Sequence, residues 1–521
     1  MSISIRTNVN SLSTARNLGY SQEKVDTAMQ RLSTGLRVNK AADDAAGLAI
    51  SEKLKSQING LNQASRNAKD AISLVQTAEG ALGEIGNMLQ RVRTLALQSV
   101  NDVNGVNERA SLQKEVSQLQ TEITRLALAS EFNGSKLLDG SFQSKRFQVG
   151  ANSGQEITIS IGGVDSSKLG VNRIATATGA ASMSAAQSGT TAVGLTNGLV
   201  AQTLTVTGPA STGAPSTVPL AANMTAKQVA DQVNLVNGET GVVAKARTSV
   251  SISLAAPANI GNIGFTLGGD VDGADLGQNT TIGGLINSTG DLSGLVQAIN
   301  DRTSVTGITA STGLTKSEII LNAEDGRDII VEGFTINGAP AAVGGLVVQG
   351  QTVADSGSTS FGVGLQNAGA AVTLSGANDS ARVGGFVRFE SSGGVNIATT
   401  DATGSLLTSV SENSELIAVN TLSVGDADSA SAAIDVLDAA IQQTNDLRAT
   451  LGAIQNRLQS TVANLDSSSE NLQISNSRIR DADVAMESAE LARAQVLMQA
   501  GISVMSQANQ QPQMALKLLG G

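Results

Sequence analysis

The sequence predicts an α+β multidomain protein, in which long α-helical coiled-coil arms at the two ends of the chain enclose β-rich outer domains in the middle. Two observations support this prediction. The six prolines lie at 209, 215, 219, 257, 340 and 512, so uninterrupted helices are permitted over 1–208 and 341–511. Apolar residues follow a heptad spacing toward both ends, whereas the middle is rich in Gly, Ser and Thr.

The N-terminal arm carries apolar residues at alternating spacings of four and three, which indicates a coiled-coil helix. From Leu54 to Val100 this helix would be roughly 70 Å long. Ser65 and Glu79 interrupt the apolar seam, and a turn over 101–105 separates this helix from a second one. The residues that we expect in the seam are Leu54, Ile58, Leu61, Ile72, Val75, Leu82, Ile85, Leu89 and Val92.

The C-terminal arm repeats this pattern after a slip in register, with seam residues Leu451, Ile454, Leu458 and Leu465. Its last stretch, 491–505, differs because apolar residues fall on nearly every helical face. A helix of this kind must be buried on all sides. We infer that neighbouring subunits bury it, although docking of this helix into its own chain explains the periodicity equally well.

The middle of the chain contains an internal repeat, over about 223–269 and 290–338. Each copy predicts a short helix ending in Asn, a glycine turn, strands and a Gly-Phe-Thr triplet. Asn234 and Asn300 are 66 positions apart and the triplets 69, so the copies differ by a three-residue insertion. We expect two related small α+β lobes, with a β-hairpin over 147–161 at the junction with the helical part.

Composition argues against catalysis, and we predict that the protein is not an enzyme. The chain has no His, Cys or Trp, which removes thiol nucleophiles, His-based triads, disulfides and Cys/His metal sites. The net charge of −11 and the 2% aromatic content disfavour nucleic-acid binding. No apolar run of about 18 residues predicts a membrane span. We expect no catalytic residue, metal or cofactor.

Asp270, Asp272 and Asp275 lie close together, but a calcium loop needs alternating carboxylates and a Glu at its twelfth position, which is Thr281. An acidic surface turn is the simpler interpretation. The charged clusters at 43–44 and 478–483 lie on predicted helices, where surface ion pairs explain them.

The two ends of the chain closely resemble bacterial flagellins. The motifs that carry the resemblance are IRTNVNSL at 5–12, LSTGLRVN at 32–39, AADDAAGLAI at 41–50, SRIRDAD at 477–483, and QANQQP at 507–512 followed by LKLL at 516–519. The resemblance covers roughly 1–165 and 430–521. It implies a structural subunit that polymerises into the flagellar filament for swimming motility.

The resemblance also implies a division into domains. An N-terminal inner-tube helix spans 1–42, a helical inner domain with a β-hairpin begins with 43–175, and variable surface-exposed domains span 176–410. The inner domain is completed by 411–482, and a C-terminal inner-tube helix spans 483–521. The residues that it implies for self-assembly in the inner tube are Leu12, Val25, Met29, Leu32, Leu36, Leu491, Leu497, Met498, Ile502, Val504, Met505, Leu516 and Leu519.

As expectations about partners, the resemblance implies a helical homopolymer outside the cell, in the flagellar filament. The flagellar type III export apparatus, a flagellin chaperone, and hook-associated junction and cap proteins are the implied flagellar partners. Recognition by the flagellin-sensing Toll-like receptor is implied through Gln90, Arg91, Leu95, Gln98 and Glu115, although Thr94 stands where an acidic residue is common.

Two alternatives are a hook–filament junction protein and a coiled-coil surface adhesin. The tail from Gln507 to Leu519 argues against the first, because junction proteins diverge from flagellins in their terminal motifs. The paired terminal motifs argue against the second.

Overall fold

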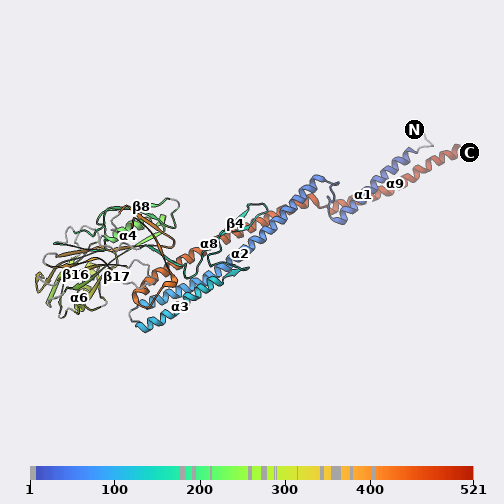
Figure 1. The fold of residues 1–521 in the computed structure, drawn as a ribbon. Coiled ribbons are helices and arrows are strands. Elements are labelled where there is room, and N and C mark those ends of the chain that lie inside the picture. Colours follow the sequence, from blue (N-terminus) through green and yellow to red (C-terminus); the bar gives the residue numbers. More distant parts are fainter. Residues whose placement is uncertain are drawn as a thin grey trace. The chain divides into compact units, whose positions relative to one another are not determined.

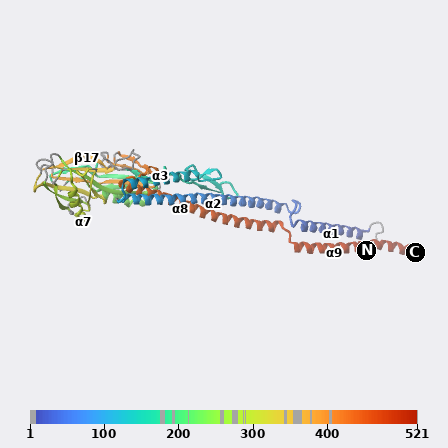
Figure 2. The ribbon, with the colours of Figure 1, turned by 90° about the horizontal axis from the view of Figure 1, so that it is seen from below.

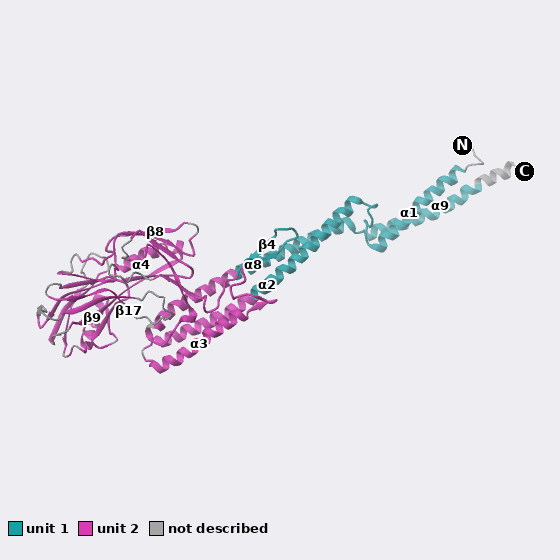
Figure 3. Ribbon diagram, in the orientation of Figure 1, with its two compact units in different colours: residues 1–76, 144–160, 451–521 teal, residues 77–143, 161–450 magenta. Residues whose placement is uncertain are grey.

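The computed structural model describes residues 8–101, 103–174, 182–190, 195–211, 214–255, 261–270, 279–286, 288, 290–313, 315–340, 345–353, 365–375, 379–401, 406–407 and 409–519. The chain forms two compact units (Figure 3). Unit 1 comprises 1–76, 144–160 and 451–521, and unit 2 comprises 77–143 and 161–450. The prediction of an α+β multidomain protein is confirmed, since long helices occupy the two ends of the chain and β-sheets its middle.

Helices α1 (Val9–Thr34) and α9 (Val484–Leu519) belong to unit 1 and run side by side (Figures 1 and 2). The Asn8 side chain caps α1 by accepting a hydrogen bond from the Ser11 amide at 3.1 Å. Gly35 ends this helix in the left-handed conformation, with φ of 69°, which costs a glycine little.

Helices α2 (Ala45–Val100) and α8 (Ala427–Arg480) each contribute to both units. Of the expected seam, the structure buries Ile58, Val75, Leu82, Ile85, Leu89, Val92, Leu451, Leu458 and Leu465 and half-buries Leu54, Leu61, Ile72 and Ile454. The interruption at Ser65 has a partner, because its hydroxyl donates to Asp466 Oδ1 at 2.9 Å. Helix α8 continues through the slip in register without a break.

After the turn, α3 (Val106–Ala129) buries Val116 and Ile123 in unit 2. Two hairpins follow, β1 (Glu131–Phe132) with β2 (Ser135–Lys136) and β3 (Lys145–Gln148) with β4 (Glu156–Ile159). The second hairpin confirms the prediction over 147–161.

The middle of the chain forms three larger sheets in unit 2. The six-stranded sheet has the order β11-β10-β14-β18-β6, with β15 beside β14. The eight-stranded sheet has the order β12-β13-β9-β19-β5-β22, with β16 on β9 and β17 on β16. The four-stranded sheet has the order β21-β20-β7-β8.

The bounds in these sheets are, in chain order, β5 Gly170–Ile174, β6 Ala186–Gly189, β7 Gln202–Thr207, β8 Ser216–Leu220, β9 Val242–Leu254, β10 Gly261–Asp270, β11 Asn279–Ile286, β12 Thr309–Thr312, β13 Glu318–Ala323, β14 Asp328–Ile336, β15 Ala339–Pro340, β16 Leu346–Val353, β17 Leu365–Leu374, β18 Ser380–Val383, β19 Phe386–Ser391, β20 Asn396–Thr399, β21 Ser411–Asn413 and β22 Glu415–Ala418. The short helices are α4 (Ala226–Leu235), α5 (Asn237–Thr240), α6 (Ser293–Asn300), α7 (Thr303–Thr306) and the 3-10 turn η1 (Val419–Thr421).

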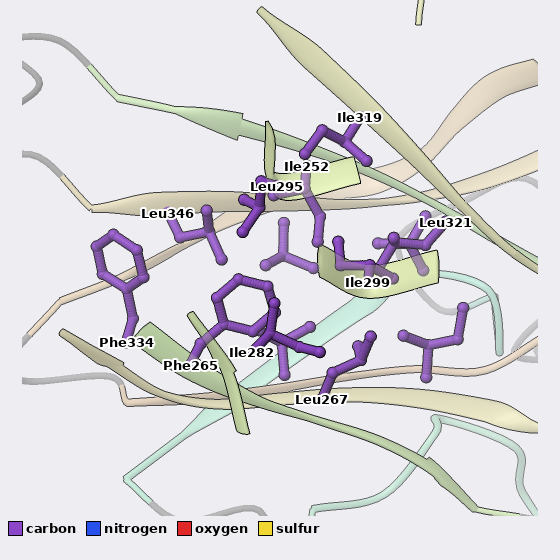
Figure 4. Packing of buried hydrophobic residues seen from close by; sticks show 14 of the residues in the cluster. Ile252, Phe265, Leu267, Ile282, Leu295, Ile299, Ile319, Leu321, Phe334 and Leu346 are labelled. Atoms are coloured by element: carbon purple, nitrogen blue, oxygen red, sulfur yellow. The ribbon is translucent and has the colours of Figure 1, made fainter. Parts of the chain in front are cut away.

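The two repeat copies do not form two separate lobes, so that expectation is wrong. Their strands interleave: β9 of the first copy pairs with β13 of the second, and β10 pairs with β14. One apolar core holds Phe265 of the first copy together with Phe334 and helix α6 of the second (Figure 4). Helix α4 of the first copy packs in another core with β7, β8 and β19. Because strand pairing is non-local, a sequence repeat does not determine where a core begins or ends.

Candidate self-assembly surface

The pairing of α1 with α9 is antiparallel and follows one heptad seam. The buried or half-buried positions on α9 are Glu487, Glu490, Leu491, Ala494, Met498, Gly501, Met505 and Ala508, and on α1 they are Ser11, Thr14, Leu18, Ser21, Val25, Ala28, Gln30, Arg31 and Leu32. All of them except Glu490, Gln30 and Arg31 follow the heptad spacing. A Cβ atom at Gly501 would lie 3.4 Å from Leu18 Cδ1, and the Asn8 amide donates to the Ala508 carbonyl at 2.8 Å. The helices therefore pack closely through small residues.

Large apolar side chains outside this seam are exposed. On α9, Val496 and Leu497 are 64% and 51% exposed, and Ile502 and Val504 are similar. On α1 the exposed set is Val9, Leu12, Tyr20 and Met29. Water-exposed apolar side chains on one helix pair are typical of a surface that another chain covers.

The residues expected in the inner tube thus fall into two groups. Val25, Leu32, Leu491, Met498 and Met505 line the seam within the chain, whereas Leu12, Met29, Leu497, Ile502 and Val504 are exposed. Leu36 is half-buried in the linker after α1. Leu516 and Leu519 belong to α9, but their side chains lie outside the described part of the structure. The sequence placed all these residues on one surface because hydrophobicity alone does not say which partner covers a side chain.

The linkers that join the terminal helices to α2 and α8 pair with each other in unit 1. Leu36 and Asp481 form an antiparallel bridge, and the Ala482 amide donates to the Gly35 carbonyl at 3.0 Å. The Arg37 amide and guanidinium donate to the carbonyls of Arg480 and Ile479, both at 2.7 Å. The SRIRDAD motif thus contributes backbone acceptors to this joint.

The aspartates near the joint act as caps, so the expectation of helix-surface ion pairs is wrong for them. Asp43 accepts hydrogen bonds from the Asn39 and Lys40 amides, and these bonds lower its pKa. Asp44 accepts from the Gly47 amide at the start of α2, and Asp483 accepts from the Ala485 amide at the start of α9. An Asp directly before a helix is a capping signal that the sequence already contained.

Ion pairs flank the α1–α9 seam. Arg31 Nη1 lies 2.8 Å from Glu487 Oε1, whose side chain is only 7% exposed. Lys24 Nζ lies 3.6 Å from Glu490 Oε1 in a more exposed position. These residues and Tyr20 line an open groove of about 440 Å³ beside the seam.

The terminal regions match two family models, described as the bacterial flagellin N-terminal helical region over residues 5–143 and the bacterial flagellin C-terminal helical region over residues 434–519. B-type flagellin of Pseudomonas aeruginosa is 37% identical over 519 residues, which cover 100% of both chains. Flagellin of Salmonella typhimurium is 34% identical over 99% of both chains, and flagellin A of Helicobacter pylori is 31% identical over 100% of both. The chain belongs to the bacterial flagellin family.

As a flagellin, the protein is a structural subunit that polymerises into the extracellular flagellar filament, and it is not an enzyme. Whole-length matches to flagellins outweigh the junction-protein and adhesin alternatives. Among the described residues, no helix is long and apolar enough to cross a membrane.

Solved structures similar to this flagellin are FliC from Burkholderia pseudomallei and hook-associated protein-3 from Legionella pneumophila. The first has 19% identity and a TM-score of 0.28, covering 74% of this chain and 99% of that one. The second has 12% identity and a TM-score of 0.32, covering 82% and 98%.

The residues expected at a receptor surface of this flagellin lie on α2 and α3. Gln90, Arg91 and Gln98 are exposed, and Arg91 Nη2 lies 2.7 Å from Glu115 Oε1. Leu95 is 1% exposed, so it is corrected to a core residue in this conformation. In unit 2 this part of α2 meets both α3, through Arg91 and Glu115, and α8, through Arg93 and Asp438, which is consistent with the burial of Leu95.

The acidic turn gives no metal site in the described structure. Asp270 is buried, and its Oδ2 accepts a hydrogen bond from Arg382 Nη2 at 2.6 Å. Asp272 and Asp275 lie outside the described residues. Nowhere in the described ranges do three acidic side chains gather as metal ligands would. Sequence reasoning missed Arg382 as the partner of Asp270 because 112 residues separate them.

Proposed function

We propose that the exposed apolar side chains of α1 and α9 form the surface through which this flagellin polymerises. The observation that carries the proposal is the exposure of Leu497, Ile502 and Val504 on a helix that already packs another set of apolar residues on α1. Covering them would contribute roughly 25 cal/mol per Å² of buried apolar area before ordering costs. The full proposed assembly set is Leu12, Met29, Leu497, Ile502 and Val504, with Leu516 and Leu519 continuing α9, while Val25, Leu32, Leu36, Leu491, Met498 and Met505 hold the helix pair and its linker together.

We assign the segments of the chain to layers of the filament along the boundaries predicted from the sequence. The segments 1–42 and 483–521 build the inner tube, and 43–175 with 411–482 build the surrounding helical layer. The segment 176–410 supplies the outer, surface-exposed domains. The burial of apolar seam residues of α2 and α8 within each unit supports the second assignment, since heptad-spaced apolar residues pack helices against one another.

Seeded polymerisation of purified subunits tests the assembly surface. Leu497→Asp places a charge on the proposed interface and should abolish elongation, as seen by light scattering and electron microscopy. Leu285→Asp is the matched control, because Leu285 is also an exposed leucine, 66% against 51% for Leu497, and lies on strand β11. Normal filaments from Leu497→Asp, or equal defects in both variants, would refute the assignment.

The exposed apolar residues of α9 also support binding of the proposed flagellar partners. A secreted subunit with an uncovered apolar helix needs protection before assembly, which a flagellin chaperone covering α9 on the way to the export apparatus would supply. Junction and cap proteins would meet the same terminal helices at the ends of the filament. Titration of the full chain with a purified flagellin chaperone measures their binding. Val504→Asp should abolish this binding, and Leu285→Asp should leave it unchanged.

A second candidate function is recognition by the flagellin-sensing Toll-like receptor. The exposed pair of Arg91 and Glu115, with Gln90 and Gln98 nearby in sequence on the same helix as Arg91, supports it. In a reporter-cell assay with monomer, Arg91→Ala should reduce the response at least tenfold, the loss expected from removing one charged interface contact. Arg125→Ala removes another exposed arginine, paired with Glu122, and serves as the control. An equal response to wild type and Arg91→Ala would exclude this role.

A further inference from the structure

The packing between α1 and α9 repeats every seven residues and does not by itself select one register. On α9 the seam alternates large and small side chains: Leu491, Met498 and Met505 are each followed three positions later by Ala494, Gly501 and Ala508. In the observed pairing Leu18 packs on Gly501. A slip of one heptad would bring Leu18 to Ala494 or Ala508, which are almost as small. Apolar packing therefore changes little between these registers.

An ion pair near the linkers distinguishes between these registers. Glu487 is the one charged residue at the heptad positions of α9 given above, and it is paired with Arg31 at 2.8 Å. A one-heptad slip would separate these two groups by about 10 Å along the helices, because seven residues rise 1.5 Å each. A slip toward Ala508 leaves Glu487 without a cation, and breaking a buried pair in this way is costly. A slip toward Ala494 instead brings Lys24, seven residues before Arg31, opposite Glu487, so that slip is opposed mainly by the linker bonds.

The paired linkers reinforce the same register. The hydrogen bonds from Ala482 to Gly35 and from Arg37 to Arg480 lie next to the Arg31–Glu487 pair, just after Arg31 in the N-terminal segment and just before Glu487 in the C-terminal segment. A slipped pair of helices would have to break these bonds as well. The seam between Ser11 and Val25, away from the linkers, would lose little apolar packing.

We propose that Arg31, Glu487 and the bridged linkers, together called the clasp, select the heptad register of the terminal helices. The clasp thereby determines which surface α1 and α9 present to a second copy of the chain. This inference rests on the proposed assembly surface. A slip moves the exposed apolar residues of α1 past those of α9 by about 10 Å, so that the two helices no longer present one matching surface to a second copy of the chain.

Because the chain has no cysteine, engineered pairs can report the register. In the full chain, Leu18→Cys with Gly501→Cys reports the observed register, and Leu18→Cys with Ala494→Cys or Ala508→Cys reports the two slips. Disulfide formation is measured during seeded polymerisation. With the clasp intact, the 18–501 disulfide should dominate. Adding Glu487→Gln should raise the slipped products about tenfold, the effect of losing one charged hydrogen bond.

Glu490→Gln is the matched control, because it removes the more exposed ion pair with Lys24 from the same helices and should leave the 18–501 disulfide dominant. If Glu487→Gln leaves the 18–501 disulfide dominant as well, packing alone sets the register and the proposal is overturned. Absence of the 18–501 disulfide with the clasp intact overturns it too. Failure of the assembly surface is a separate outcome, since Leu497→Asp would then polymerise normally whatever the disulfides show.

Discussion

Asn234 and Asn300 make the same two hydrogen bonds in different parts of the chain. Each side-chain amide donates to a backbone carbonyl ten residues ahead, of Ala244 and Ala310, at 2.9 Å in both cases. Each side-chain oxygen also accepts from the amide of that same alanine, at 2.8 Å and 2.7 Å. In both copies of the repeat, an asparagine side chain therefore joins the end of a helix to the start of a strand.

We expect Asn234→Ala and Asn300→Ala each to lower the free energy of unfolding by about 1–3 kcal/mol, because both backbone groups of the following alanine lose a partner. Calorimetric unfolding of the full chain measures the effect. Asp231→Ala, at an exposed position on the same helix as Asn234, should change stability far less. A loss confined to only one of the two asparagines would show that the copies are not energetically equivalent.

Sequence periodicity predicted the parts of this fold in which neighbours along the chain become neighbours in space. The 4-3 spacing of Leu82, Ile85 and Leu89 fixes one face of a helix whatever covers it, and all three are buried. The terminal motifs likewise led to the family, because each is a continuous stretch of sequence.

Long-range pairing was the part that the sequence did not reveal. Leu95 was expected at a surface but is buried. Nothing local in the sequence shows that α2 meets both α3 and α8 in unit 2, as the Arg91–Glu115 and Arg93–Asp438 pairs do. The repeat predicted separate lobes, whereas strand β9 pairs with strands far apart in sequence, β13, β16 and β19. Which apolar residues of α9 face α1 also depended on a partner helix more than 450 residues away, as the Arg31–Glu487 bond illustrates.

Asp328 should make unit 2 less stable at neutral pH than at pH 4. Burial raises its pKa from 3.8 to about 7, although Arg382 and Asn197 donate to its Oδ2. Arg382 is shared with Asp270, and no donor among the described residues reaches Asp328 Oδ1. Between pH 4 and 7 the folded state holds a proton that the unfolded state has lost, so stability falls as pH rises through this range.

Asp328→Asn mimics the protonated carboxyl and should raise the melting temperature at pH 8 by several degrees, since about 1 kcal/mol corresponds to 2–4 °C in a domain of 150–250 residues. The variant should also flatten the dependence between pH 4 and 7. Asp301→Asn, at an exposed site, provides the comparison. An unchanged pH profile would mean that Arg382 keeps Asp328 ionised throughout.

Glu390 should have the opposite pH signature. Burial raises its pKa, but Arg173, Arg388 and Lys245 together outweigh burial, so its pKa lies below the ordinary value of 4.5. Its stabilising contribution is therefore present above pH 4.5 and is lost as pH falls through the folded-state pKa. Glu390→Gln should destabilise unit 2 by about 3–5 kcal/mol at pH 7, because it leaves buried cations uncompensated.

Thermal unfolding of Glu390→Gln and wild type between pH 3 and 8 checks this expectation, and the gap between them should narrow as the pH falls. Glu324→Gln removes an exposed carboxylate that lies 3.0 Å from Arg247, and it should have little effect at any pH. If the difference in stability between Glu390→Gln and wild type stayed constant down to pH 3, the destabilisation would come from altered packing and not from the lost charge.

Gly501 should tolerate Ala but not Leu. Its Cα faces Leu18, and a single added carbon would lie at ordinary contact distance, 3.4 Å from Leu18 Cδ1. A leucine there would push α1 and α9 apart, and overpacking of this kind costs about 1–3 kcal/mol. Since Leu favours helix formation more than Gly does, a defect cannot come from lost helix propensity.

We therefore expect Gly501→Leu to raise the critical concentration for seeded polymerisation about tenfold, and Gly501→Ala to leave it nearly unchanged. Gly19→Leu is the control on α1, where an added Cβ meets no atom within 4 Å. Fluorescence of Tyr20, the single tyrosine in a chain without tryptophan, reports the environment of α1 in the same samples. If Gly501→Leu polymerised like wild type while Tyr20 fluorescence also stayed unchanged, the close approach of the two helices would not be needed for assembly.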